Sequence, residues 1–569
     1  MRAAHLFDMF QTALREYEAV SAETTFAEGS TRTAIDVRRF SWIRPLAGDY
    51  AFNFANVASL YAGDPTSAAA WSDAITRTRA AARPRAAVAE LLAAQQSRRG
   101  APPAAREAAA RLATPQTVAI VTGQQAGVFG GPLFTLLKAI TALQLARKTA
   151  RDHQTEVVAV FWVDAEDHDW NEIASCTVLD QAFQPQTITL PAPEGAGERP
   201  IAALTLDSRV EHSLAELEAA LGPTEFTAPL LTGLRGAYRS GAGAADAFAQ
   251  WLETLLGPHG LIVFDSSDLA AKPLVADLFT RELREAGRTS ALAVAAGQTL
   301  SARGHQPQVV PQPDSAALFH VDGARRPIRK QGDQLVAGER AFSVDALANE
   351  ATSAPHHFSP NVLLRPIVQD SLFPTIGYVA GPSELAYLGQ LRDVYARFGV
   401  PMPIMYPRAT ATLVDSATAR FLSRHDVELA DLQPQDESAL NRLLQAQLPQ
   451  SVETALREAE QALRERMATL IDAVPAIDPT LAGAAKTTLS KMEHDLRALH
   501  GKMIQAAKRR DETLRRQFTR AQGQIFPSGH AQERTLGSVY FLNRYGPALI
   551  DRLFAELPLD LGHHWIITV

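Results

Sequence analysis

Five short apolar runs, each ending in polar residues, recur along the first three quarters of the chain. They lie within residues 117–123, 156–167, 260–268, 375–391 and 402–415, and helical patterns follow most of them. The runs are continuously apolar rather than alternating, which is typical of strands buried on both faces of a parallel sheet. Because the carboxyl ends of parallel strands meet at one edge, the pattern predicts an α/β fold with a ligand site at that edge.

The remaining parts of the N-terminal half do not follow this alternation. Residues 1–115 show mostly helical patterns, and residues 1–20 predict an amphipathic helix rather than a signal peptide, because acidic residues interrupt the apolar positions. Two stretches interrupt the α/β pattern. Residues near 183–250 are rich in Pro, Gly and Ala with a weak strand pattern, and residues near 295–358 predict short strands and turns. We therefore expect a core over residues 1–415 with an N-terminal helical region and two insertions.

Beyond residue 430 the apolar positions adopt a spacing of alternating threes and fours. One such series covers residues 452–474 and a second covers residues 485–503. This heptad spacing predicts an antiparallel pair of helices, and we place an α-helical coiled coil at residues 416–520. A helical domain packed on the core is the alternative. We expect the coiled coil to mediate homodimerisation, with its heptads paired within one chain, between chains or both, and residues 521–569 to return to the core.

The composition limits the class of protein. Of the 569 residues, 46% are hydrophobic and 21% are charged, which is typical of a folded chain. The net charge of −7 argues against a nucleic-acid-binding protein, which usually carries a basic stripe. No apolar run reaches the roughly 20 residues that span a membrane. The single cysteine, Cys176, allows no internal disulfide, so we expect a cytoplasmic protein without nucleic-acid or membrane partners.

The first polar cluster is a glycine loop in "VTGQQAGVFGGPLFTLLKAI", residues 121–140. Its glycines fit neither the Walker spacing nor the G-x-G-x-x-G fingerprint. Glycine still lets backbone N–H groups approach an anion, and the following helix aims its free N–H groups at the loop. A tight turn that serves helix–sheet packing is the alternative. A lysine in the helix adds a point charge for a carboxylate or phosphate. We assign substrate binding here to Gly123, Gln124, Gln125, Gly130, Gly131 and Lys138.

The second cluster, in "WVDAEDHDWNE", consists of ionisable residues directly after a strand: Asp164, Glu166, Asp167, His168, Asp169 and Glu172. Crowded carboxylates raise one another's pKa and need a cation nearby. Three uses are open, namely metal ligation, acid–base catalysis by the histidine, and binding of a substrate ammonium group. A solvated acidic turn is the structural alternative. No H-x-x-x-H pattern or cysteine partner accompanies the cluster, so we assign no metal ligands, and a metal requirement is left open.

Two further motifs supply candidates for anion binding. In "GYVAGPSELAY", Gly381, Ser383 and Glu384 begin a helix whose N-terminus suits an anion, although an ordinary serine cap explains the same pattern. In "SPNVLLRPIVQD", Asn361 and Arg365 would share a helix face, whereas the proline that follows suggests a broken turn. The arginine can hold a carboxylate or phosphate through two hydrogen bonds, and a surface ion pair is equally consistent with the pattern.

Together these motifs resemble the cysteine-adding enzymes of bacillithiol synthesis, the BshC family of cysteine ligases. The resemblance rests on "VTGQQAGVFGGPLFTLLKAI", "FWVDAEDHDWNEI" and "SPNVLLRPIVQDSLFPTIGYVAGPSELAYLGQL", followed in order by "MPIMYPRATATLVD" and "FPSGHAQERTLGSVYFLNRYGPALIDRL". It implies a Rossmann-like core with connecting-peptide insertions and an α-helical coiled coil through which two chains dimerise. It also implies the last step of bacillithiol assembly, which joins L-cysteine to glucosaminyl malate through an amide bond.

The resemblance also implies a nucleotide-binding site near the coiled coil, and the residues themselves suggest binding roles. An amide formed from a free carboxylate and an amine needs carboxyl activation, and ATP (or another nucleotide that contains ADP) is the expected cosubstrate. The glycine loop with Lys138 would hold an anion, either the malate carboxylates or a phosphate. Arg365 and Ser383 would complete this anion site, and Asp164 or Glu166 would bind the cysteine ammonium group.

His168 is the expected acid–base catalyst. It would take the proton from the attacking amine, with Asp167 or Asp169 orienting its ring. Two other classes of function stay open on the sequence. One is a nucleotidyl- or glycosyl-transferase on a similar sheet, and the other is a non-enzymatic coiled-coil scaffold that senses a metabolite.

Overall fold

The structure is a computed structural model that describes residues 32–40, 42–446, 449–510 and 512–569, with the side chains of 507–510 left aside. The amphipathic helix predicted for residues 1–20 lies outside the described residues. The chain forms two compact units. One comprises the described residues up to Leu413 together with Gln532–Val569, and the other comprises Val414–Ala531.

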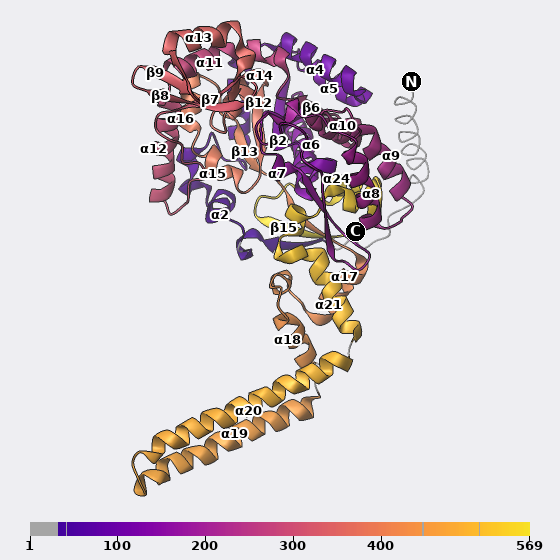
Figure 1. Ribbon diagram of the computed structural model, residues 1–569, viewed down its shortest axis with the longest axis vertical. Coiled ribbons are helices and arrows are strands. Elements are labelled where there is room, and N and C mark those ends of the chain that lie inside the picture. Colours follow the sequence, from indigo (N-terminus) through magenta and orange to yellow (C-terminus); the bar gives the residue numbers. More distant parts are fainter. Residues whose placement is uncertain (1–31, 41, 447–448, 511) are drawn as a thin grey trace. The chain divides into compact units, whose positions relative to one another are not determined.

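The first unit is built on a parallel sheet, so the predicted α/β fold class is confirmed (Figure 1). The strand order is β13-β12-β2-β3-β6. If the five strands are numbered by their order in the chain and read from the β6 edge, the order is 3-2-1-4-5, which is the Rossmann arrangement. The order reverses between β2 and β12. The strands are β2 (Val118–Gln125), β3 (Val157–Asp164), β6 (Leu261–Asp265), β12 (Thr375–Ala380) and β13 (Ile404–Pro407).

Both faces of this sheet are covered, which explains why its strands are continuously apolar. Along β3, Phe161 and Val163 point into one hydrophobic core, while Val160 and Trp162 point into the other. Helices α6 (Leu133–His153) and α10 (Ala244–Leu256) contribute to the first core. Helices α4 (Arg85–Arg99) and α5 (Pro103–Arg111) contribute to the second. Because helices cover both faces of the sheet, polar residues can reach solvent only at the ends of the strands.

The first insertion differs from its prediction. Strand β4 (Ser175–Leu179) lies just before it and pairs with β5 (Pro185–Thr189), which lies at its start. Most of residues 183–250, however, are helical. The helices are α8 (Arg209–Leu221), α9 (Thr227–Ala237) and the first part of α10. The prediction of weak strands was wrong because Pro and Gly lie between these helices, while leucines three and four residues apart form their buried faces.

The second insertion contains the predicted short strands and turns. Its antiparallel sheet has the order β10-β9-β8-β7-β11. Helix α12 (Arg288–Ala302) precedes the sheet, and α13 (Val344–Ser353) and the 3-10 turn η8 (Pro355–His357) lie between its last two strands. The strands are β7 (Ser315–Val321), β8 (Arg325–Gln331), β9 (Gln334–Ala337), β10 (Arg340–Ser343) and β11 (Phe358–Pro360).

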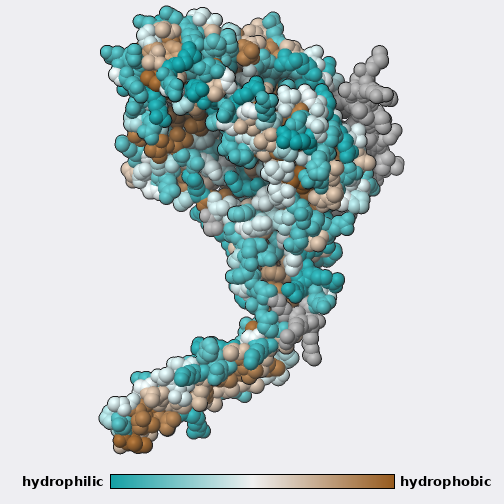
Figure 2. Space-filling view, in the orientation of Figure 1, coloured by the Kyte–Doolittle hydropathy of each residue, from teal (hydrophilic) through white to brown (hydrophobic). Residues whose placement is uncertain are grey.

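The second unit contains the predicted helical hairpin, formed within one chain. Helices α19 (Gln450–Ala473) and α20 (Leu481–Arg510) lie side by side and antiparallel (Figure 1). Ion pairs between Arg464 and Glu493 (2.8 Å) and between His500 and Glu453 (3.0 Å) cross between them. Apolar side chains gather at the tip of the hairpin, where Ile477 is 83% exposed (Figure 2). The heptads therefore pair within the chain and still leave apolar surface uncovered.

After the hairpin, the chain adds a last set of elements to the first unit. These are α22 (Gln532–Thr535), α23 (Ser538–Tyr545), α24 (Ala548–Glu556) and β15 (His563–Thr568). The carbonyl of Leu536 accepts a hydrogen bond from the Leu133 N–H at 2.8 Å, which covers the start of α6. Among the described residues, no helix has both the length and the apolar character that a membrane crossing requires.

Candidate functional site

A cleft of about 590 Å³ opens where four parallel strands end. It is lined by residues that follow β13, β12, β2 and β3, and it therefore includes the point between β2 and β12 where the strand order reverses. In open α/β sheets this crevice is the usual place for a ligand. Helix α6, the short helix α15 (Glu384–Leu388) and helix α14 (Arg365–Leu372) complete its walls.

Carboxylates line the side of the cleft that follows β3. Asp164, the last residue of β3, pairs with Arg365 at 2.5 Å. The side-chain amide of Gln125 donates to Asp167 at 2.9 Å and to Glu172 at 2.6 Å. Arg365, together with Arg325 at 3.8 Å from Asp167, thus faces three carboxylates on this wall, which we call the acidic wall. A substrate ammonium or amine group would complete the charge balance there.

Asp164 carries the most perturbed carboxyl group of this wall. Burial raises its pKa to about 6, and the positive charge of Arg365 opposes this rise. One of its oxygens, Oδ1, is buried and has no hydrogen-bond partner among the described residues. Asp167 behaves differently. Burial raises its pKa as well, but the hydrogen bond from Gln125 and the charge of Arg365 outweigh burial and lower it overall. Asp164 is thus a carboxyl group able to exchange a proton near neutral pH.

The opposite side of the cleft is basic and begins with a buried lysine. The ammonium group of Lys138 pairs with Glu384 at 2.5 Å and donates to the carbonyl of Gly123 at 2.7 Å. Gln124 accepts a further, longer bond at 3.3 Å. Burial lowers the pKa of Lys138, while Glu384 acts to raise it. Glu384 also accepts from the Gly381 N–H at 2.5 Å, so the lysine joins the ends of β2 and β12.

Two arginines complete this basic wall. Arg408 follows β13 and forms two hydrogen bonds to Glu533, at 2.8 and 2.6 Å, so its charge is largely balanced. Arg534 lies beside Glu533 on α22, with its guanidinium 5.8 Å from the ring centre of Phe134. Arg534 forms no hydrogen bond or ion pair with any other described residue. The basic wall therefore presents an exposed guanidinium with free donors, suited to a carboxylate or phosphate.

Two more polar atoms in the cleft lack partners. The hydroxyl of Thr135 on α6 and the indole N–H of Trp162 on β3 are both buried without a hydrogen bond among the described residues. Buried polar groups are almost always hydrogen-bonded, so unpaired ones that line a cleft indicate where a ligand binds. Together with Asp164, they place such atoms on both sides of the cleft.

The structure brings ten of the sixteen predicted site residues together at the cleft. These ten are Gly123, Gln124, Gln125, Lys138, Asp164, Asp167, Arg365, Gly381, Ser383 and Glu384. They come from five segments that span residues 123–384, and only the sheet edge makes them neighbours. The other six are absent from its lining: Gly130, Gly131, Glu166, His168, Asp169 and Asn361.

Gly130 and Gly131, which the sequence predicts to bind an anion, pack inside the protein and do not line the cleft. A Cβ atom on Gly130 would lie 2.9 Å from the indole of Trp251, and the backbone there has φ +89°. The Gly130 N–H donates to the hydroxyl of Tyr238 at 3.1 Å, and the Gly131 N–H donates to Val128 at 3.1 Å. Since both N–H groups bond within the protein, neither is free to bind an anion.

His168 lies on the other side of Asp167 from the cleft. Its side chain is 42% exposed and lines a separate cavity of about 560 Å³ together with Arg325. Its Nδ1 is 3.4 Å from an oxygen of Asp167 and also 3.4 Å from a guanidinium nitrogen of Arg325. Asp169 caps the short helix α7 (Trp170–Ile173) by accepting from the Glu172 N–H at 3.3 Å. His168 and Asp169 are therefore not part of the cleft lining, although their neighbour Asp167 is.

Glu166 and Asn361 have structural partners. Glu166 forms a buried ion pair with Lys272, which also donates to the carbonyl of Phe358 at 3.0 Å. Asn361 accepts from the backbone N–H of Leu363 at 2.9 Å. The turn predicted after Arg365 was wrong, because proline at the second position of α14 lies in the first turn, where its missing N–H costs nothing.

Sequence reasoning missed several residues of the cleft. Arg408 directly follows β13 at the sheet edge, so its position after a predicted strand was a usable signal. Tyr378 and Tyr387 flank Glu384 within a motif that was already singled out. Arg534 carried no local signal, because it comes from a segment beyond the helical hairpin that only tertiary folding brings to the cleft.

The fold defines a Rossmann-type α/β protein with a cleft at the strand switch, joined to a coiled-coil unit. Two family descriptions match this division. Residues 33–409 match "Bacillithiol biosynthesis BshC, N-terminal Rossmann-like domain", and residues 411–569 match "Bacillithiol biosynthesis BshC, C-terminal coiled-coil domain". The chain belongs to the BshC family of bacillithiol biosynthesis, so the resemblance seen in the sequence is confirmed.

Several relatives align over most of their length, and each is named "Putative cysteine ligase BshC". The protein of Salinibacter ruber is 34% identical, over 92% of this chain and 95% of its own. The protein of Koribacter versatilis is 34% identical, over 76% and 81%. The protein of Symbiobacterium thermophilum is also 34% identical, over 84% and 88%.

Proposed function

We propose that this chain is a ligase that joins L-cysteine to glucosaminyl malate through an amide bond, as the last step of bacillithiol synthesis. Membership of the BshC family and the names of its relatives support the reaction class. The observation that carries the substrate assignment is the charge separation across the cleft. In one group, Lys138, Arg408 and Arg534 exceed their partners Glu384 and Glu533 by one charge. In the other, Asp164, Asp167 and Glu172 exceed Arg365 and Arg325 by one charge.

The charges of glucosaminyl malate are complementary to those of the cleft. Its malate part carries two carboxylates, and its sugar carries the amine that is to be acylated. We assign the carboxylates to the basic wall, where Arg534 offers unpaired donors, and the amine to the acidic wall near Asp164. The hydroxyl of Thr135 and the indole N–H of Trp162 are available to sugar or carboxylate oxygens.

The amine must lose a proton when it attacks the cysteine carboxyl carbon. We assign this proton to Asp164, because its Oδ1 has no partner and its pKa of about 6 suits exchange near neutral pH. Asp167, with its lowered pKa, stays ionised and holds positive charge nearby. This assignment replaces His168, which lines the neighbouring cavity instead.

The cosubstrate is part of the proposal. A carboxylate does not condense with an amine in water without activation, and ATP is the nucleotide that we propose to activate the cysteine carboxyl group. Glycines that pack against Trp251 and Tyr238 do not provide a phosphate loop, so the proposal assigns no residue of that loop to the nucleotide.

Removing the guanidinium of Arg534 should weaken binding of the sugar malate selectively. We expect Arg534→Ala to raise the Kd for glucosaminyl malate by about 10- to 150-fold, the loss of one or two charge-assisted hydrogen bonds. The change should leave the thermal unfolding curve in place, since Arg534 forms no ion pair with the residues that the structure describes. Titration calorimetry measures the Kd, and Arg534→Lys should recover part of the affinity. An unchanged Kd in Arg534→Ala would show that the malate part does not bind at the basic wall.

The pH profile should report the ionisation of Asp164. The carboxylate form is the proton acceptor, so activity should be lost as the pH falls through about 6 and should reach a plateau above it. The profile of kcat/KM against pH should therefore show an acid limb with a midpoint near pH 6. A midpoint near the ordinary carboxyl value of about 4 would contradict the assignment.

We also propose that two chains form a homodimer through the helical hairpin. Within the hairpin, Leu470, Met492 and Leu499 are between 42% and 48% exposed although they lie at heptad positions. A second hairpin would bury these side chains. We expect sedimentation of the full chain to give about twice 61.5 kDa, and Leu499→Glu to give the monomer mass. Thr488→Glu, an exposed polar position of α20, should remain a dimer. A monomeric wild-type chain would refute this proposal.

A further inference from the structure

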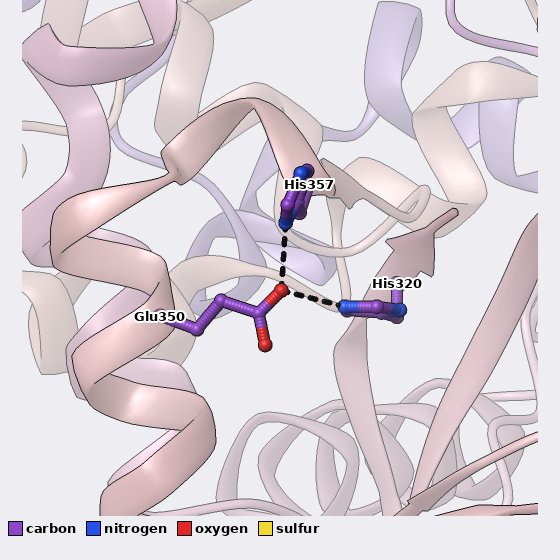
Figure 3. Close-up of side chains that lie close together, drawn as sticks. All are labelled: His320, Glu350 and His357. Carbon is purple, nitrogen blue, oxygen red and sulfur yellow. Dashed lines mark hydrogen bonds and ion pairs between the residues drawn. The ribbon is translucent and has the colours of Figure 1, made fainter. Parts of the chain in front are cut away.

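A second group of chemically able side chains lies in the second insertion, outside the cleft (Figure 3). His320, Glu350 and His357 converge on one point. The same carboxylate oxygen, Oε1 of Glu350, lies 3.0 Å from Nε2 of His320 and 2.7 Å from Nδ1 of His357. One potential ligand atom from each residue lies within 4.8 Å of the other two.

The fold brings three separate segments to this cluster. His320 lies on β7 directly opposite Phe358 of β11, and His357 ends η8 immediately before that strand. Glu350 lies in the last turns of α13, which leads into η8. The rings of Phe342 and Phe358 lie 5.5 Å from the His320 ring. The cluster therefore has a base fixed by a strand pair and by aromatic packing.

Burial decreases across the cluster in one direction. The side chain of His320 is 2% exposed, that of Glu350 is 25% exposed and that of His357 is 41% exposed. A ligand set of this kind is closed on the protein side and open to water on the other. Two arginines of this sheet, Arg326 and Arg340, both pair with Asp322.

We propose that His320, Glu350 and His357 bind a divalent transition-metal ion of the zinc type, with water in the fourth position. Two imidazole nitrogens and one carboxylate oxygen are the ligands that zinc accepts, and three protein ligands plus an open position form a tetrahedral site. Nothing in this proposal depends on the ligase reaction.

The two contacts to the carboxylate need little change to admit the ion. With bonds of about 2.0–2.1 Å, tetrahedral ligand atoms lie about 3.4 Å apart. The two contacts of 3.0 and 2.7 Å would thus widen by about half an ångström, which rotation of the partly exposed His357 and Glu350 side chains can supply. A carboxylate oxygen only accepts hydrogen bonds, so both ring nitrogens now carry protons. A metal would take the place of these two protons, and each neutral ring would then carry its proton on the other nitrogen.

The position of the cluster suggests what the metal would do. His357 precedes Phe358, whose carbonyl accepts from Lys272, the partner of Glu166 in the predicted acidic cluster. Arg325 donates to the carbonyl of Pro360 at 3.0 Å, two residues further along. A metal that joins β7, α13 and η8 would therefore fix the start of the segment that leads to Arg365 in the cleft. The sequence did not reveal the site, because its ligands are 30 and 7 residues apart and form no known spacing.

The test uses the full-length chain, freed of metal by a chelator and then titrated with Zn²⁺ by calorimetry and with Co²⁺ by visible absorption. We expect one ion per chain and the intense d–d bands of tetrahedral Co²⁺ in the wild type. Glu350→Gln, which keeps the shape of the side chain, and His357→Ala should each weaken Zn²⁺ binding by about 100-fold or more. The control is His356→Ala, since His356 is adjacent in the chain but outside the cluster.

His356→Ala should bind Zn²⁺ as the wild type does, and Zn²⁺ should raise the Tm of both these proteins but not that of His357→Ala. The proposal is overturned if the wild-type chain binds Zn²⁺ and Co²⁺ no better than Glu350→Gln does. It is overturned as well if His356→Ala loses binding as strongly as His357→Ala.

Discussion

Replacing Asp164 with asparagine is expected to lower kcat of the ligase reaction by about 10²- to 10⁴-fold, the usual contribution of a positioned acid–base group. Asparagine keeps the size of the side chain but cannot accept a proton. It also leaves Arg365 without its 2.5 Å partner, so some loss of substrate positioning will add to the chemical effect. Steady-state rates measured above pH 7, where wild-type Asp164 is ionised, give the comparison.

Two neighbours in the same cluster serve as matched controls for Asp164→Asn. Asp169→Asn changes a carboxyl group that caps α7 and does not line the cleft, so kcat should stay close to the wild-type value. His168→Ala removes the histidine that lines the neighbouring cavity, and it should cost far less than Asp164→Asn. If His168→Ala instead abolished activity while Asp164→Asn retained it, the proton would belong to the histidine, as the sequence alone predicted.

Replacing Lys138 with methionine is expected to lower the free energy of unfolding by about 3–5 kcal/mol, the cost of removing one member of a buried ion pair. Methionine fills similar space but leaves Glu384 without its cation and the Gly123 carbonyl without its donor. The basic wall should also lose one of its three cations, so binding of glucosaminyl malate should weaken. Urea unfolding followed by circular dichroism measures the stability.

Lys148→Met is the matched control, because Lys148 lies on the same helix and also has an ion-pair partner, Asp152. Both of these side chains are about half exposed, and such pairs contribute about 0–1 kcal/mol. The free energy of unfolding should therefore change little in this variant. Equal losses in Lys138→Met and Lys148→Met would show that the buried pair does not support the sheet edge.

Much of the core and part of the site could be predicted from the sequence, because both depend on local patterns. Each strand of the parallel sheet is a continuous apolar run. Its end is marked by a polar residue or a glycine, such as Asp164 at the end of β3 and Gly381 directly after β12. The edge that collects them follows from the parallel arrangement itself. Heptad spacing likewise predicted the helical hairpin, since its apolar positions recur at a fixed interval.

The rest depended on contacts that no local pattern records. The sequence predicts that the end of the glycine loop binds an anion. In the structure, Trp251 and Ser538 pack against Gly130 and leave no room for a side chain there. His168 and Asp167 are adjacent in sequence but face different cavities. Arg534 reaches the cleft from a segment more than a hundred residues beyond β13. In each case a distant part of the chain decides the role of the residue.

The central claim is tested most directly by incubating the purified chain with glucosaminyl malate, L-cysteine and ATP and following the thiol product by mass spectrometry. The account predicts a product with the mass of the two substrates less one water, formed with ATP and absent when ATP is omitted. Release of nucleotide without consumption of cysteine would instead indicate a nucleotidyl- or glycosyl-transferase. No turnover of any of the three compounds by the folded chain would contradict the ligase assignment.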